Sequence, residues 1–329
     1  WTPMNSLVEQ FIQIFRVQLR QASDTAVVDT ASATQTVATH ADNFTSTAPA
    51  ATTTRGLTVG TGLTAVALTD RALVTKIAEG SGAGQLLYKA ASFNLPTTTG
   101  TEARLTIDRQ FENASGGSIT INEVGWECQA YNAVPTAFNF LLARELSTQT
   151  ILTGNTATLT VRLYTASVGL INLMNLLYGF IANTTVASVI NTDNGGRTLS
   201  MDAASMAANG TNAGAALSID IRGIVVGTGN TAFAATHIAL ATAINSGSTA
   251  GRLNHLADTF SSVTSNRRFT ERRSITNTSG ASINVNEYGV SLESNTATGQ
   301  SRFLGLRTVP TVLAIADLGA GVFEYIWEI

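Results

Sequence analysis

The sequence predicts a mainly β fold: two tandem antiparallel β-sandwich domains, each with an N-terminal amphipathic helix and a short second helix. Two observations support this prediction. The chain contains an internal duplication, and both copies carry short segments of alternating apolar and polar residues separated by Gly-, Asn- and Ser-rich turns. This pattern is typical of antiparallel sandwiches. The two domains are expected at residues 1–165 and 166–329.

The duplication keeps its order and spacing over about a hundred residues of each half. GLTVGTGLTAVALT at 56–69 corresponds to GIVVGTGNTAFAAT at 223–236, and residues 108–125 match 272–289. A chance similarity would not preserve this order. The two halves are therefore expected to share one fold.

Each half is expected to begin with an amphipathic helix, near residues 6–20 and 169–182. Ser6 and Glu9 have the spacing of a capping box. Apolar residues then follow at helical spacing: Leu7, Val8, Phe11, Ile12, Phe15 and Leu19.

A second, shorter helix is predicted at about 70–78, with a counterpart at about 237–244. The stretches 21–55 and 183–218 are rich in Thr, Ala, Ser, Asn and Gly. Long loops, short exposed strands and arms that order against neighbours all remain open for them.

The remaining segments are predicted to be strands. A hairpin is expected around the turn Asn113–Gly117, and a change in apolar parity predicts a β-bulge at Asn122–Glu123 and at Asn286–Glu287. Further strands are expected at 137–144, 157–164, 301–307 and 321–328.

The composition restricts the classes of partner. Only 12% of the residues are charged, the net charge is −3, and Lys76 and Lys89 are the only lysines. A nucleic-acid binder needs a basic surface, and no apolar run reaches the length of a membrane span, so neither partner is expected. Much of the surface is instead expected to face other protein.

Two glycine motifs have the spacing of a dinucleotide-binding fingerprint. Gly60 and Gly62 open a GxGxxA pattern that recurs at Gly227 and Gly229. In a dinucleotide site the strand leads directly into a helix whose N-terminus faces the pyrophosphate, and that context is missing here. We therefore expect tight glycine turns and no cofactor.

Glu123 and Glu287 stand at the predicted bulges, where a side chain can be aimed at a site. Catalysis by paired carboxylates would need a second acid, and the acids on the following strands do not occupy matching positions. The Asn-Glu groups are expected instead to hydrogen-bond turn amides or to pair with Arg109 and Arg273. The histidines lack metal-ligand spacing, so neither a metal nor an enzymatic activity is expected.

The residues around 56–145 resemble a group of small structural proteins encoded by tailed bacteriophages. The resemblance rests on Gly60, Gly62, Thr64, Ala65, Asp70, Leu73, Leu86, Tyr88, Arg109, Phe111, Asn113, Ser115, Gly116, Glu123, Gly125, Phe140, Leu141 and Arg144. The second copy departs from the pattern at His237, His255 and Ile275, and most such proteins carry one copy. The shared structural motif covers Gly60, Gly62, Asn113, Gly116, Glu123, Gly125, Gly227, Gly229, Asn277, Gly280, Glu287 and Gly289.

The resemblance implies a non-enzymatic virion component whose partners are itself and other capsid or tail proteins. A capsid decoration or cement protein, packed as a homo-oligomer or lattice, is the first hypothesis. The alternative is a tail- or fibre-associated protein that binds a host-surface glycan, with Trp126, Tyr131 and Trp327 as candidate stacking residues.

Overall fold

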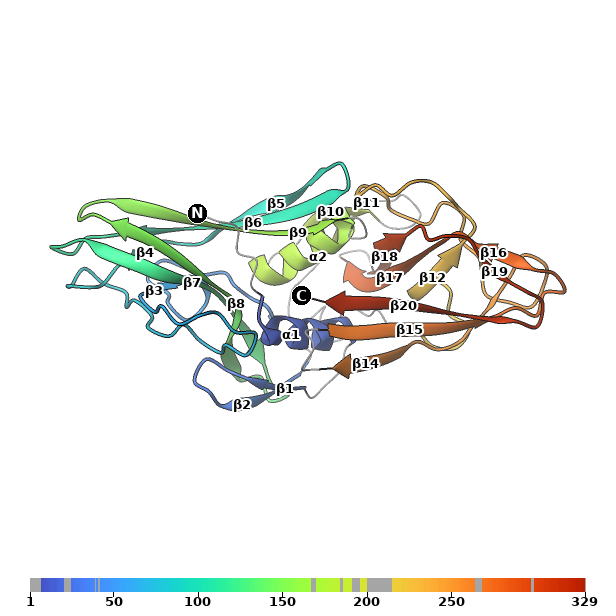
Figure 1. The fold of residues 1–329 in the computed structure, drawn as a ribbon, viewed down its shortest axis with the longest axis horizontal. Coiled ribbons are helices and arrows are strands. Elements are labelled where there is room, and N and C mark those ends of the chain that lie inside the picture. Colours follow the sequence, from blue (N-terminus) through green and yellow to red (C-terminus); the bar gives the residue numbers. More distant parts are fainter. Residues whose placement is uncertain are drawn as a thin grey trace.

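The computed structural model describes residues 7–20, 25–38, 40, 42–166, 170–183, 186–190, 196–199, 215–263, 268–296 and 299–328. Strands form both ends of the molecule, and the two helices lie between them (Figure 1). The mainly β, antiparallel fold class is therefore confirmed.

The first repeat contains one helix and nine strands among the described residues. They are α1 (Glu9–Arg20), β1 (Thr25–Val28), β2 (Thr34–Val37), β3 (Gly56–Gly60), β4 (Leu87–Tyr88), β5 (Ser92–Thr99), β6 (Glu102–Glu112), β7 (Ile119–Tyr131), β8 (Ala137–Ile151) and β9 (Thr156–Ala166). Strands β3–β7–β8 form one sheet, and β6 pairs with β4, β5 and β9 in another.

The second repeat follows the same order. It contains α2 (Ile171–Ala182), β10 (Val186–Ile190), β11 (Gly196–Leu199), β12 (Gly223–Gly227), β13 (Asn254–His255), β14 (Thr259–Val263), β15 (Arg268–Thr276), β16 (Ile283–Val285), β17 (Glu287–Thr296), β18 (Gly299–Thr308), β19 (Leu313–Ile315) and β20 (Ala320–Glu328). Strands β12–β17–β18 correspond to β3–β7–β8, and β15 pairs with β13, β14 and β20 as β6 pairs with its neighbours. This arrangement is compatible with tandem sandwiches, and the boundary between 165 and 166 stays a prediction.

The predicted hairpin at Asn113–Gly117 is wrong. Strands β6 and β7 do not pair with each other; they belong to different sheets, and the turn crosses between the sheets. The Asn113 amide holds the crossing by donating to the carbonyl oxygens of Gly117 and Ile151, both at 2.8 Å. Asn277 repeats this with Ala281 and Ile315, at 2.7 and 2.8 Å.

The predicted second helices at 70–78 and 237–244 are also wrong, because both segments are irregular. A helix needs its backbone N–H groups for bonds to carbonyls four residues back. Here the N–H groups of Val74 and Thr75 are taken by the carboxylate of Glu123, at 3.1 and 2.8 Å. A non-local carboxylate has therefore replaced the local helical bonds.

The bulge prediction is confirmed in the first repeat, where the register of β7 against β8 shifts between Ile121 and Glu123. In the second repeat the same point is a break between β16 and β17, at Asn286. The backbone N–H of Asn286 donates to the carbonyl of Gly227 at 2.9 Å. The face switch thus turns Glu123 and Glu287 inward.

The predicted N-terminal helices are present as α1 and α2, although Ser6 of the capping box lies outside the described residues. Each helix is anchored identically on its own repeat. The N–H of Val8 donates to Leu142 O at 2.9 Å, and that of Leu170 donates to Gly305 O at 3.0 Å. No helix among the described residues has the length and apolar character of a membrane span.

Helix α2 also joins the two halves. It packs against β5 and β6 of the first repeat and β18 of the second. At its C-terminal end, Ser46 N–H and Thr47 Oγ1 of the first repeat donate to the carbonyls of Ile181 and Ala182, both at 2.8 Å. It is therefore buried on most sides, unlike the one-sided amphipathic helix that was predicted.

Candidate functional site

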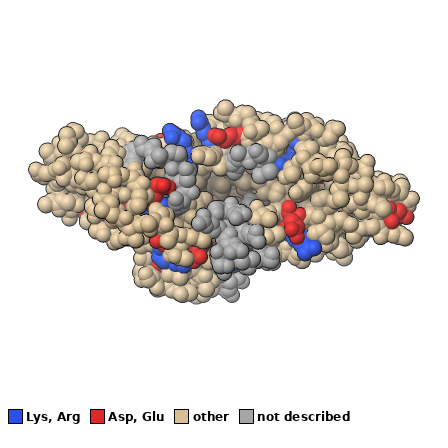
Figure 2. Space-filling model, viewed as in Figure 1, with Lys and Arg blue, Asp and Glu red and all other residues tan. Residues whose placement is uncertain are grey.

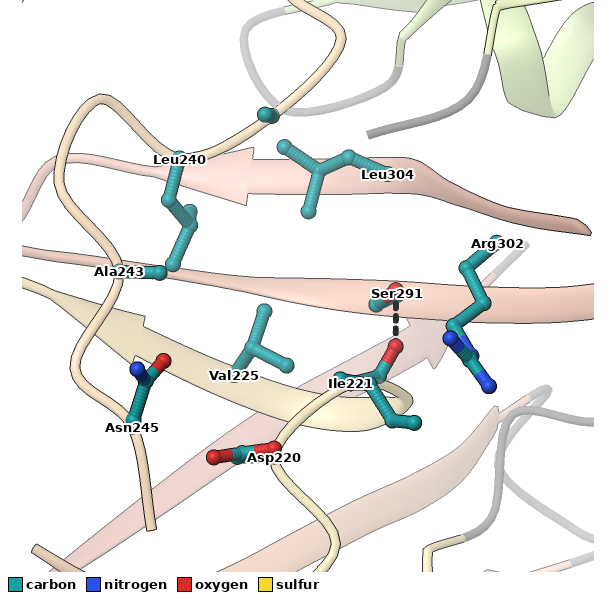
Figure 3. Close-up of a pocket in the computed structure, with 10 residues that line it drawn as sticks. Asp220, Ile221, Val225, Leu240, Ala243, Asn245, Ser291, Arg302 and Leu304 are labelled. Atoms are coloured by element: carbon teal, nitrogen blue, oxygen red, sulfur yellow. Dashed lines mark hydrogen bonds between the residues drawn. The ribbon is translucent and has the colours of Figure 1, made fainter. Parts of the chain in front are cut away.

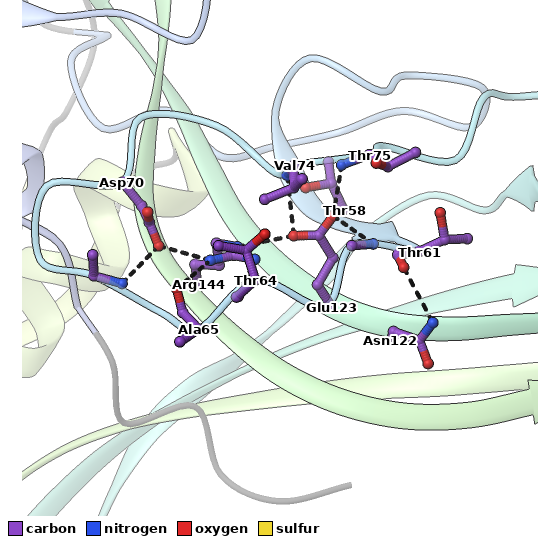
Figure 4. Close-up of polar contacts among 12 residues, drawn as sticks. Thr58, Thr61, Thr64, Ala65, Asp70, Val74, Thr75, Asn122, Glu123 and Arg144 are labelled. Atoms are coloured by element: carbon purple, nitrogen blue, oxygen red, sulfur yellow. Dashed lines mark hydrogen bonds and ion pairs between the residues drawn. The ribbon is translucent and has the colours of Figure 1, made fainter.

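The motif carboxylate of the first repeat lies in a fully satisfied buried cluster (Figure 4). Glu123 is 0% exposed, and its Oε1 accepts hydrogen bonds from the N–H groups of Gly62 at 3.0 Å and Thr75 at 2.8 Å. Its Oε2 accepts from Arg144 Nε at 2.9 Å. Burial by itself raises the pKa of Glu123, but the hydrogen bonds from Thr75, Arg144 and Val74 outweigh it and hold that pKa below its usual value.

The glycine motif makes room for this carboxylate. A Cβ atom added at Gly60 or at Gly62 would lie 2.5 Å from Glu123 Oε1. The GxGxxA pattern is therefore explained by close approach to a buried side chain. Its glycines serve the same purpose in the second repeat, where a Cβ at Gly227 would lie 2.7 Å from Glu287 Oε1.

The second repeat rebuilds the cluster with one change. Glu287 accepts from the N–H groups of Gly229 at 3.2 Å and Thr242 at 2.9 Å, and pairs with Arg307 at 2.8 Å. The first-repeat arginine also pairs with Asp70, whereas Arg307 meets the Nδ1 atom of His237 at 2.9 Å.

The predicted pairing with Arg109 and Arg273 is therefore wrong; the partners of the motif carboxylates are Arg144 and Arg307. Arg109 instead donates to five backbone carbonyls, those of Pro49, Thr52, Arg55, Leu57 and Lys89. Arg273 makes the equivalent set of bonds to Ala216, Ile219, Arg222, Ile224 and Leu256. These two side chains hold the loops that precede β3 and β12.

The other motif positions also have structural roles. The Asn113 carboxamide oxygen accepts from the N–H and hydroxyl of Ser115, so the Asn-x-Ser triplet is a turn, as expected. Gly280 has φ +87°, which favours glycine. A Cβ at Gly125 would lie 2.9 Å from Leu73, and one at Gly289 would lie 2.5 Å from a backbone carbonyl. Nothing in the structure explains Gly116, which has open space around it.

These clusters are suited to cross-linking strands. Glu123 has its proton-accepting positions occupied by N–H donors and a pKa below the usual value, so it is a poor general base at neutral pH. Among the described residues, no group of three or more His, Cys, Asp and Glu side chains could hold a metal ion.

Of the aromatic residues proposed for glycan stacking, Trp126 is buried and Tyr131 is half-buried. Trp126 is 0% exposed and donates from Nε1 to Ser46 Oγ at 2.8 Å. Tyr131 stacks on His40, with 4.3 Å between ring centroids. The side chain of Trp327 lies outside the described residues.

The repeats differ most at a pocket of about 310 Å³ in the second repeat (Figure 3). Val225, Leu240, Ala243 and Leu304 supply apolar walls, and Asp220, Asn245, Ser291 and Arg302 supply the polar groups. The Ser291 hydroxyl donates to Ile221 O at 2.8 Å.

The first repeat fills the same place with an ion pair. In the strand register, Glu127 stands opposite Gly56, and Ser291 stands at the equivalent place opposite Gly223. Lys76 forms a β-bridge with Gly60, and Ala243 forms the equivalent bridge with Gly227. Lys76 Nζ lies 2.7 Å from the Glu127 carboxylate, which is 0% exposed. The two copies of the sequence differ at both positions, with Lys76 and Glu127 in the first and Ala243 and Ser291 in the second. No local sequence pattern shows that the two side chains lie together.

A second difference surrounds Arg273. Tyr88, whose hydroxyl donates to Ile77 O at 2.6 Å, is replaced by His255. Asp258 stands 3.5 Å from Arg273, where the first repeat has no carboxylate. Burial, and secondarily Arg273, lowers the pKa of His255 to about 4, while burial raises the pKa of Asp258 to about 7 against the opposing effect of Arg273.

His255→Tyr is expected to stabilise the protein more at pH 5 than at pH 8. The folded state favours neutral His255, so the stability that this residue contributes to the fold is lost as the pH falls from about 6.5 towards 4. The folded state also favours protonated Asp258, so the stability that Asp258 contributes to the fold increases as the pH falls from about 7 towards 4. The substitution removes the loss of stability that His255 causes at low pH, and the new tyrosine supplies the hydroxyl that Tyr88 has in the first repeat. Melting temperatures at the two pH values check this, and an equal shift at both would contradict it.

No protein-family model matches this chain, and no curated protein or solved structure is significantly similar to it. The functional proposal therefore depends on the residues and their environments.

Proposed function

We propose that this chain is a non-enzymatic virion structural protein of a tailed bacteriophage. Its first candidate role is that of a capsid decoration or cement protein, or another particle-surface component, that packs as a homo-oligomer or lattice. The resemblance over about 56–145 suggests the virion, and the placement of charge supports a role in assembly.

The observation that carries the proposal is that several of the protein's few charged side chains lie inside the fold. At least four of its 19 Lys and Arg residues are fully buried: Arg109, Arg144, Arg273 and Arg307. The carboxylates of Glu123, Glu127, Glu271 and Glu287 are also 0% exposed. On the face shown in Figure 2, the charged side chains form small, separated groups among uncharged residues. Interface cores are depleted of charge, so this surface suits protein–protein packing.

An exposed leucine in the second repeat supports the same proposal. Leu318 is 84% exposed and has φ 61°, in a turn where the first repeat has Gly154 at φ 75°. Their N–H groups make equivalent bonds, to Asn277 O and Asn113 O. Bulky residues rarely adopt this backbone conformation, and exposing leucine is unfavourable in a monomer. A contact with another subunit would offset both costs.

Self-association is the expected result for the purified chain. Light scattering after gel filtration, over a concentration series, should give a mass that rises to a defined multiple of 34.3 kDa. Leu318→Gly, which copies the first repeat, should weaken this association without lowering the melting temperature. A stable monomer at every concentration would contradict the proposal.

Cryo-electron microscopy of the virus particles tests the location. Density for two similar β repeats per chain on the capsid lattice is expected. Density at the tail tip or fibres would favour the glycan-binding alternative, and absence from the particles would overturn the virion role.

A further inference from the structure

The second-repeat pocket lacks the lysine side chain that occupies the corresponding space in the first repeat. In the first repeat, the Lys76 stem crosses this space and its ammonium group contacts Glu127 at 2.7 Å and Thr53 O at 3.0 Å. In the second repeat, Ala243 and Ser291 stand in place of Lys76 and Glu127, and no side chain of the described residues fills the space (Figure 3).

The apolar walls of the pocket suit an aliphatic stem. Val225 and Leu304 are 7% and 1% exposed, and Leu240 packs against them. Val225 replaces Thr58, whose hydroxyl contacts the Glu127 carboxylate at 3.2 Å in the first repeat. The wall has therefore become more apolar where the carboxylate has been lost. Methylenes packed against such walls are removed from water, which stabilises the bound stem.

A carboxylate, that of Asp220, also lines the pocket. By the repeat spacing, Asp220 corresponds to Thr53, the residue whose carbonyl accepts from Lys76 in the first repeat. Asp220 accepts from Ser246 N–H at 2.6 Å; its charge interacts with Arg273 at longer range, but no cationic side chain of the described residues lies within ion-pair distance of it. It can therefore accept a cation from outside the chain.

Arg302, which also lines the pocket, is paired within the chain. Arg302 lies 3.0 Å from the Glu293 carboxylate, which Arg222 also contacts at 2.8 Å. The first repeat has Asn139 and Gln129 in place of Arg302 and Glu293. Arg302 and Glu293 cancel each other, as Lys76 and Glu127 do in the first repeat, so Asp220 makes the second-repeat pocket one unit more negative than its counterpart.

We propose that this pocket binds a primary alkylammonium group, with its stem against Val225 and Leu304 and its charge at Asp220. The chemistry is shared by a lysine side chain of a neighbouring protein and by a free polyamine. The inference comes from the comparison of the two repeats and does not require the virion role.

The test measures the binding of n-butylammonium to the full chain by nuclear magnetic resonance of the ligand. The uncharged n-butanol is the control. Saturable binding of the ammonium compound, at least tenfold tighter than that of n-butanol, is expected. Asp220→Asn keeps an acceptor for Ser246 and should weaken binding at least tenfold. Equal binding of the two compounds, or an unchanged affinity in D220N, would overturn the proposal.

A filled-pocket variant provides the matched control. The double substitution A243K/S291E copies the first-repeat ion pair, so it should fold and lose n-butylammonium binding; A243K alone serves if the double variant does not fold. Unchanged binding in a folded filled-pocket variant would overturn the proposal.

Lys76→Ala provides a positive control in the first repeat. It leaves the Glu127 carboxylate buried without its cation, and n-butylammonium should raise the melting temperature of this variant more than that of the unmodified chain. Absence of this rescue would count against the proposal, because n-butylammonium would then have failed to replace the Lys76 side chain beside Glu127.

The two sources are distinguished by comparing a capped lysine with 1,4-diaminobutane. Tighter binding of the capped lysine assigns a protein partner. Tighter binding of the diamine assigns a free polyamine. Both outcomes support an ammonium site. If neither compound binds, the proposal is overturned.

Discussion

Glu123→Ala is expected to lower the free energy of unfolding by about 3–5 kcal/mol, the usual cost of breaking a buried ion pair. Arg144 would lose its fully buried partner at 2.9 Å and keep only the part-exposed Asp70, and the N–H groups of Gly62, Val74 and Thr75 would lose their acceptor. Guanidinium titration followed by fluorescence measures the loss, since Trp126 is buried in the same repeat.

Glu112→Ala is the matched control for this prediction. Glu112 also pairs with a cation, Lys89, but the two side chains are 33% and 41% exposed. Exposed pairs contribute little, so a change below about 1 kcal/mol is expected. A loss in the Glu123 variant no larger than that in the Glu112 variant would show that the cluster is not a stabilising cross-link.

Arg109→Met is expected to have a comparably large effect, above about 4 kcal/mol, because several charge-assisted hydrogen bonds are lost together. Methionine keeps much of the apolar volume but leaves five carbonyls without their donor. The loop before β3 should also become sensitive to protease, since Arg109 holds it through Pro49, Thr52 and Arg55. Denaturant titration and limited proteolysis measure the two effects.

Arg104→Met provides the comparison on the same strand. Arg104 is exposed on β6 and donates to Thr97 at 3.1 Å, so its loss should change stability by less than about 0.5 kcal/mol. Arg109→Lys should fall between the two variants, because an ammonium group has three donors where the guanidinium has five. Equal stability of the variants at 104 and 109 would contradict the role given to Arg109.

The sequence predicted the strands well and their partners less well. Apolar alternation is local, so the segments at 137–144, 157–164, 301–307 and 321–328 all lie within observed strands. Pairing is not local: a Gly- and Ser-containing turn such as Asn113–Gly117 has the same composition whether it joins paired strands or crosses between sheets. The bonds from Asn113 to distant carbonyls decide between them.

The candidate site was predictable to the same extent. The expectation that Glu123 would bind turn amides is confirmed, because a buried carboxylate beside a glycine turn needs N–H donors. The choice of Arg109 as its partner is wrong, since only the register of β7 against β8 places Arg144 beside Gly125 and the bulge. The pocket depends on the meeting of positions 243 and 291, which no local pattern reveals.

The inward placement of charge also determines how the protein responds to ionic strength and temperature. Salt screens exposed charges beyond about 8 Å under physiological conditions, but the pairs Glu123–Arg144 and Glu287–Arg307 are closed to ions. A surface with few charges offers salt little to screen. An assembly joined through such surfaces would persist in concentrated salt and loosen on cooling, because apolar association weakens as the temperature falls.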